Sequence, residues 1–176
     1  MSQYDPNKHH RRSIRKPDYD YSAAGLYFIT ICVQRRLCLF GHVHEGSMHL
    51  NDAGRMVEEY WLNLPWRFPN IRVDAFQLMP NHLHGIIEIL EPNNFSREID
   101  PTGKNIVLGA IVGAFKSEAT NAYIAGVKEN NWSPFDKKLF QRDYWEHIIR
   151  NKEAYDRICW YIANNPANWP EDSLHQ

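Results

Sequence analysis

The chain has 176 residues, a formal net charge of −1, 43% hydrophobic residues and 23% charged residues. These values are typical of a globular domain with a single core. No apolar run is long enough to span a bilayer, and three cysteines without a CxxC pair argue against a disulfide framework or a zinc–thiolate site. The near-neutral charge argues against binding long duplex DNA by charge alone.

The first 24 residues are polar and form a predicted N-terminal arm. Residues 8–16, KHHRRSIRK, contain five Lys or Arg and two His. Such a cluster is typical either of a nucleic-acid contact or of a solvated arm, and both interpretations stay open. No apolar stretch follows these charges, so the arm is not a secretory signal. We therefore expect a cytoplasmic protein with no membrane partner.

The elements predicted after the arm alternate between strands and helices. Hydrophobic periodicity, β-formers, caps and prolines place their bounds. The expected order is a strand at Leu26–Gln34, a hairpin of Leu37–Phe40 and Met48–Leu50 around the turn GHVHEGS, a helix from the cap Asn51 to Pro65, strands at Ile71–Leu78 and His82–Leu90, a helix at Ile106–Ala125, a strand at Leu139–Ile149, and a helix from the cap Asn151 to Asn165.

This order predicts an α+β fold, a ferredoxin-like sandwich in which helices pack on a central antiparallel sheet. We expect an arm over residues 1–24, a single domain over residues 25–169 and a C-terminal tail over residues 170–176.

Two histidines stand one residue apart in the apolar segment MPNHLHGIIEI, residues 79–89. Residues i and i+2 of a strand point to the same face, so His82 and His84 project side by side and Leu83 points away. Two neutral imidazoles on a rigid strand make a two-point metal chelate. The alternative is that one or both are hydrogen-bonded core residues.

A second pair, His42 and His44, has the same spacing but lies between Gly41 and Gly46 in what should be an exposed hairpin. It lacks a buried strand that would hold its geometry. We therefore interpret it as a solvated pair.

The last helix carries two further candidates. Tyr161 and Asn165 are four residues apart and share a helix face at the edge of the apolar stripe. Tyr161 could supply a phenolic nucleophile, and Asn165 a carbonyl oxygen for a metal. The alternative is a boundary aromatic and a C-terminal cap. Tyr155 lies in the stripe and is expected to be structural.

These residues occur in an ordered set: GLYFITICVQRR, then MPNHLHGIIEI, then FQRDYWEHIIRNKEAYDRICWYIANNP. In this set the chain resembles the REP-associated tyrosine transposases, which are insertion sequence 200-like members of the single-tyrosine HUH endonucleases. The match covers most of Gly25 to Trp169, and a tyrosine on a helix just before Asn-Pro makes it fairly specific.

The resemblance implies the HUH endonuclease fold and a transposase that cleaves and rejoins single-stranded DNA near hairpins. It implies that Tyr161 is the nucleophile of a 5′-phosphotyrosine intermediate, and that His82, His84 and Asn165 bind Mg²⁺ or Mn²⁺. Many members have Gln where this chain has Asn165. A monomer and a homodimer both stay open, as does whether Tyr161 acts in its own subunit. Expected DNA contacts are Arg11, Arg12, Arg15, Lys16, Arg35, Arg36 and Lys116.

Three alternatives remain. A replication initiator or relaxase would use the same chemistry. A domesticated hairpin-binding protein would not cleave, although the intact His82, His84 and Tyr161 argue against it. An unrelated metallohydrolase would need carboxylates near the histidines, and Glu88 is roughly 20 Å from His82 along the strand.

Overall fold

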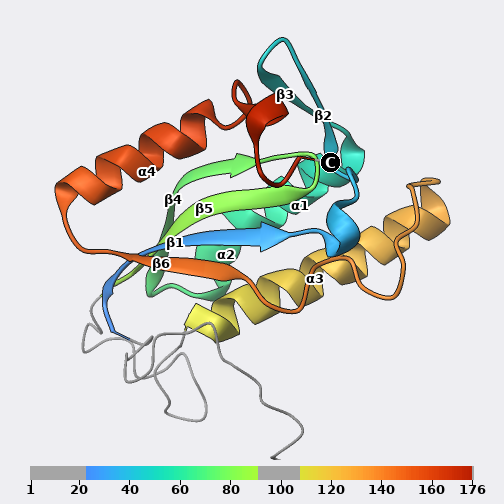
Figure 1. The fold of residues 1–176 in the computed structure, drawn as a ribbon. Helices are drawn as coiled ribbons and strands as arrows, with labels where there is room; N and C mark the ends of the chain where they lie inside the picture. Colours follow the sequence, from blue (N-terminus) through green and yellow to red (C-terminus); the bar gives the residue numbers. More distant parts are fainter. Residues whose placement is uncertain (1–22, 91–107, 176) are drawn as a thin grey trace, which may run out of the picture.

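The structure, a computed structural model, describes residues 23–90 and 108–175 (Figure 1). Its centre is a four-stranded antiparallel sheet in the order β4-β5-β1-β6. The strands are β1 (Gly25–Cys32), β4 (Ile71–Leu78), β5 (His82–Ile89) and β6 (Trp145–Ile149). This strand order, with helical segments between β1 and β4 and between β5 and β6, confirms the predicted ferredoxin-like sandwich.

Helices cover both faces of the sheet (Figure 1). One face carries α1 and α3, and α4 lies over the opposite face toward β4. No helix in the described part of the chain is both long and apolar enough to cross a membrane. The helices are α1 (Asp52–Leu62), α2 (Leu64–Arg67), α3 (Leu108–Glu129) and α4 (Lys152–Asn164), with short 3₁₀ turns η1 (Gln34–Arg36) and η3 (Trp169–Glu171).

Both predicted helix caps form. The Asn51 side chain accepts a hydrogen bond from the Gly54 amide, and the Asn151 side chain accepts one from the Ala154 amide. Each cap satisfies a backbone donor that the first turn of a helix leaves unpaired. α1 ends at Leu62, shortly before Pro65, and Pro65 lies in the first turn of α2, where a proline is tolerated.

The central strand β5 belongs to two apolar layers. Leu83 and Ile87 pack into the main core between the sheet and the helices α1 and α3. On the other face, Ile86 packs with Ile162 of α4 in a smaller cluster. The same alternation sends His82 and His84 toward the α4 face.

The predicted hairpin exists and its second strand lies where expected, but its first strand lies in the segment that was expected to be the turn. The two strands are β2 (Gly41–His44) and β3 (Ser47–Leu50), and only Glu45 and Gly46 form the turn. Both turn residues have positive φ, which is typical of the tight turns that match strand twist. The expected strand at Leu37–Phe40 is therefore wrong.

The last predicted strand begins six residues later than expected, at Trp145 rather than Leu139. Phe140 forms only an isolated bridge with Val33. The ammonium of Lys116 on α3 accounts for the difference, because it donates to the carbonyl oxygens of the next three residues, Gln141, Arg142 and Asp143. Those carbonyls are turned toward a cation rather than toward a neighbouring strand.

Candidate functional site

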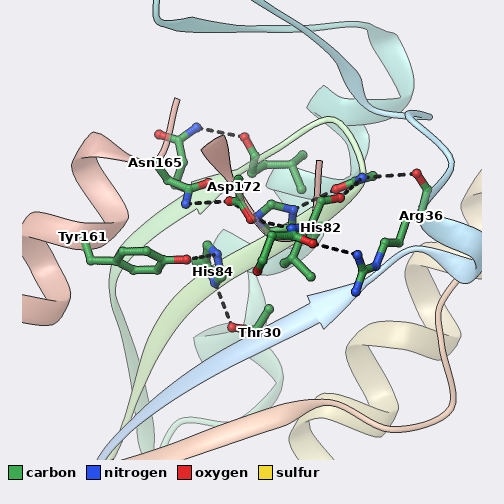
Figure 2. Close-up of polar contacts among 12 residues, drawn as sticks. Thr30, Arg36, His82, His84, Tyr161, Asn165 and Asp172 are labelled. Atoms are coloured by element: carbon green, nitrogen blue, oxygen red, sulfur yellow. Dashed lines mark hydrogen bonds and ion pairs between the residues drawn. The ribbon is translucent and has the colours of Figure 1, made fainter. Parts of the chain in front are cut away.

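The two histidines of β5 lie side by side on the α4 face of the sheet (Figure 2). His82 is 0% exposed, His84 is 3% exposed, and their ring centroids are 4.5 Å apart. Leu83 between them points into the main core. The strand geometry predicted for this pair is what the structure shows.

Each histidine is oriented through its Nδ1 atom. His82 Nδ1 is 2.8 Å from Asn81 Oδ1, and His84 Nδ1 is 2.8 Å from Thr30 Oγ1. The Asn81 amide nitrogen donates to the carbonyl oxygens of Arg36 and Leu174, so its oxygen faces His82. Because that oxygen can only accept, His82 Nδ1 carries the proton and Nε2 keeps its lone pair for the site.

Tyr161 extends from α4 to the second histidine. Its hydroxyl oxygen is 3.2 Å from His84 Nε2, and its ring packs edge-on against Phe28 and His84. The side chain remains 41% exposed, so solvent and a ligand can both reach it. Burial, together with the Asp172 carboxylate, raises the pKa of the Tyr161 phenol above its usual value. The phenol is therefore protonated at neutral pH.

A carboxylate that the sequence patterns did not single out completes the cluster. Asp172 Oδ2 lies 3.9 Å from His82 Nε2, and the candidate ligand atoms of His82, His84 and Asp172 all lie within 4.8 Å of one another. The Asn165 amide nitrogen donates to the same carboxylate oxygen at 3.1 Å. Asn165 therefore lies at the site, next to Asp172, whose carboxylate is a stronger metal ligand than an amide oxygen.

Two buried polar atoms at this cluster have no hydrogen-bond partner among the described residues: His82 Nε2 and Asn165 Oδ1. Leaving such atoms unsatisfied is costly, and an ion that both can ligate would relieve the cost. Two imidazole nitrogens, a carboxylate and an amide oxygen form a donor set suited to a divalent cation. The residues present therefore fit the metal that the family resemblance implies.

The electrostatics favour ligation. Burial lowers the pKa of His82 to about 4, against the opposing effect of the Asp172 carboxylate. Burial, together with neighbouring His82, lowers the pKa of His84 well below its usual value. Both imidazoles are therefore neutral near pH 7, which is the form that binds a metal.

Comparisons with known proteins agree with this fold. No family model matches the chain. An uncharacterized protein of Haemophilus influenzae is 41% identical over 99% of this chain and 98% of its own length, and the chain belongs to the same family as that protein. A second H. influenzae protein, proposed to be a REP-associated tyrosine transposase, is 22% identical over 89% of this chain and 84% of its own.

Among solved structures, a REP-associated tyrosine transposase bound to a REP hairpin has the same fold. It superposes with a TM-score of 0.59 at 20% identity, over 88% of this chain and 74% of that one. The chain is similar in sequence and in fold to REP-associated tyrosine transposases. Its resemblance in sequence is thus matched by its fold.

The segment after α4 holds the carboxylate in place (Figure 2). Arg36 donates to the carbonyl oxygen of Ser173 at 2.8 Å, and Trp169 packs against the His82 ring. The segment expected to be a tail, residues 170–176, therefore contributes Asp172 to the site. A lone Asp in a short polar segment carries no periodicity or motif, so no sequence signal distinguished it.

The predicted DNA contacts fall into three groups. Arg11, Arg12, Arg15 and Lys16 lie outside the described residues. Arg35 forms an ion pair with Asp136 at 2.8 Å, and Arg36 lies beside the site. The Lys116 ammonium donates hydrogen bonds to three carbonyl oxygens of the loop before β6. Burial lowers the pKa of Lys116 to about 8. In this structure Lys116 therefore holds that loop.

The second histidine pair does not join the site. His42 and His44 are exposed on β2, and their nearest aromatic neighbour is the exposed His49 of β3. Tyr155, expected to be structural, donates to Asp74 Oδ2 at 2.6 Å and so ties α4 to β4.

Proposed function

We propose that this protein is a single-tyrosine, divalent-metal-dependent transposase that cleaves and rejoins single-stranded DNA near hairpins. The observation that carries the proposal is the position of the Tyr161 hydroxyl, 3.2 Å from His84 Nε2 at the edge of the His82–His84–Asp172 cluster. A partly exposed phenol beside a candidate metal site has the geometry that a nucleophile needs.

In the proposed reaction the Tyr161 oxygen attacks the scissile phosphorus. A bond forms between the tyrosine and the 5′ phosphate, the bond from phosphorus to the 3′ oxygen breaks, and that oxygen leaves as a 3′-hydroxyl after taking a proton. The phenol proton passes to solvent, which the 41% exposure of Tyr161 allows. The phosphotyrosine ester retains the bond energy, so a second 3′-hydroxyl can reverse the step and rejoin DNA.

His82, His84 and Asp172 would hold the cation, with Asn165 positioning the carboxylate or adding its free Oδ1. When bound, a divalent ion neutralises phosphate charge and stabilises the leaving oxygen. The chain itself orients the imidazoles through Asn81 and Thr30 and positions the phenol through Phe28.

The test is a covalent adduct on a denaturing gel. The protein is incubated with Mg²⁺ or Mn²⁺ and a pool of hairpins whose single-stranded flanks are randomised. DNA labelled at its 3′ end should comigrate with the protein, whereas the 5′ label should be released on a fragment with a free 3′-hydroxyl. This polarity follows from linkage of Tyr161 to the 5′ side of the cut.

Matched variants assign the roles. Tyr161→Phe should form no adduct, whereas Tyr155→Phe, on the same helix, should retain it. His82→Ala should abolish cleavage, whereas His42→Ala should leave it intact. An adduct that persists in Tyr161→Phe, or equal loss from both histidine variants, would overturn these assignments.

A second candidate function is metal-assisted hydrolysis without a covalent intermediate. The observation that favours it is Asp172, because a metallohydrolase needs a carboxylate near the histidines. It predicts cleaved DNA without an adduct and full activity in Tyr161→Phe. A wild-type protein that binds hairpins but never cuts them would instead support the binding-protein alternative.

A further inference from the structure

Trp145 is the first residue of β6, the edge strand of the sheet. It pairs with Thr30 of β1, and cross-strand partners project from the same face. Thr30 is the residue that contacts His84 Nδ1 at 2.8 Å. Trp145 therefore lies on the face of the sheet that carries the candidate site, directly opposite Thr30, the residue that orients His84.

This indole is uncovered. Trp145 is 65% exposed, although it stands on the face of the sheet that α4 packs against. The apolar cluster under α4 includes Ile149 at the other end of β6 but not Trp145. α4 covers the β4 side of this face and leaves the Trp145 end of β6 exposed. The Trp145 ring therefore does not pack in a hydrophobic core.

A positive charge lies on the face of α4 that carries Tyr161. Arg157 lies four residues before Tyr161, which places both on one helix face. Its side chain is exposed and forms no ion pair with any residue in the described ranges. An exposed aromatic ring and a free guanidinium flanking a nucleophile are the two elements of a single-strand binding surface, one for a base and one for a phosphate.

We propose that Trp145 stacks on an unpaired nucleobase of the strand that Tyr161 attacks, and so holds the neighbouring phosphate at the site. The identity of the strand rests on the proposed function. Because every base has a π-face, this contact tolerates sequence changes. Trp145 would thus contribute affinity for single strands, while the hairpin and other contacts would select the target.

The test measures binding separately from cleavage. In a Tyr161→Phe background, a fluorescently labelled thymidine 15-mer is titrated with the full-length protein, and anisotropy is recorded over a range of salt. Trp145→Ala should weaken binding about 5- to 100-fold. Trp145→Phe, which keeps a stacking ring, should recover most of that affinity. The salt dependence of binding should be unchanged in Trp145→Ala, because no charge is removed.

Trp66→Ala is the matched control. Trp66 is 87% exposed but belongs to α2, whose Leu64 packs into the main core on the opposite face of the sheet. Its loss should leave affinity unchanged. Equal losses from both alanine variants, normal binding by Trp145→Ala, or no binding of the 15-mer by the parent protein would each overturn the stacking role.

The adduct assay keeps the two proposals separable. If Trp145→Ala weakens binding while wild type forms no adduct, the stacking role stands and the transposase chemistry fails. If wild type forms the adduct and Trp145→Ala binds the 15-mer normally, the chemistry stands and the stacking role fails.

Discussion

At the scale of single residues, hydrogen bonds orient the side chains of the site, and two of these side chains, His82 and Asn165, keep a polar atom without a partner among the described residues. Asn81 and Thr30 engage the Nδ1 atoms of the histidines, which directs Nε2 into the site. The free atoms of His82 and Asn165 are buried, and each unsatisfied atom costs about 1–3 kcal/mol. A ligand that pairs with both would return that energy as binding affinity.

Asp172 and Asn165 are both candidates for the third metal ligand, and they differ in charge. A carboxylate is a stronger ligand for Mg²⁺ or Mn²⁺ than an amide oxygen. Asp172→Asn should therefore weaken Mn²⁺ binding by about 100-fold or more. Asn165→Ala, which removes a hydrogen bond to that carboxylate, should weaken it by only about 10-fold. Isothermal titration calorimetry measures both values.

Asp156→Asn serves as the control, because that exposed carboxylate pairs with Lys152 outside the site. Its Mn²⁺ affinity should match that of wild type. If Asn165→Ala loses more affinity than Asp172→Asn, the ligand set expected from the family resemblance is right and Asp172 acts only through Asn165.

At the scale of elements, β5 links the core to the site. Gly85 follows His84 and faces Trp61 of α1, and a Cβ atom there would lie 2.5 Å from Trp61 Cζ2. The absent side chain lets α1 approach the strand closely. The packing of α1 against β5 therefore fixes the position of His84 from the far side of the sheet.

Gly85→Ala should thus be destabilising. Overpacking of this kind costs about 1–3 kcal/mol, which lowers the Tm by several degrees. Gly113→Ala is the matched substitution, because Gly113 lies in the second turn of α3 and nothing lies within 4 Å of its added Cβ. That change should stabilise the helix by about 0.5–1 kcal/mol. Thermal unfolding followed by circular dichroism distinguishes the two, and an unchanged Tm in Gly85→Ala would contradict the packing argument.

At the scale of the whole molecule, one chain supplies every residue of the candidate site. β1, β5, α4 and the segment after η3 all converge on it, and Tyr161 contacts His84 of the same chain (Figure 2). A site complete within one subunit favours action of Tyr161 in its own chain. Dimerisation is not required for the geometry.

A mixing experiment tests this expectation. Tyr161→Phe and His82→Ala are each expected to be inactive, and their mixture should also form no adduct, because neither chain has a complete site. If subunits exchanged tyrosine helices, the mixture would restore sites with an intact Tyr161 and an intact His82. Adduct formation by the mixture alone would show that the tyrosine acts on the partner's site.

The sequence by itself determined the sandwich, the histidine pair and the tyrosine helix. Alternation along β5 and the caps Asn51 and Asn151 are local properties, so short-range patterns were sufficient to predict them. The start of β6 and the position of the first hairpin strand did not follow from short-range patterns. The start of β6 depends on Lys116, which lies more than twenty residues before it. The hairpin depends on a turn at Glu45 and Gly46, and Glu-Gly is not a common turn dipeptide.

Only the tertiary structure decided the composition of the site. Asp172 reaches His82 because Arg36 and Asn81 bind the carbonyl groups of the segment that carries it. Trp145 lies on the same face of the sheet as the site because β6 pairs with β1 at Thr30. Arg36 and Ser173 are 137 residues apart, and Asn81 and Leu174 are 93 residues apart. Thr30 and Trp145 are likewise far apart in the sequence. Such contacts depend on how distant segments of the chain pack together in the folded protein, and no repeat or spacing in the sequence predicts that packing.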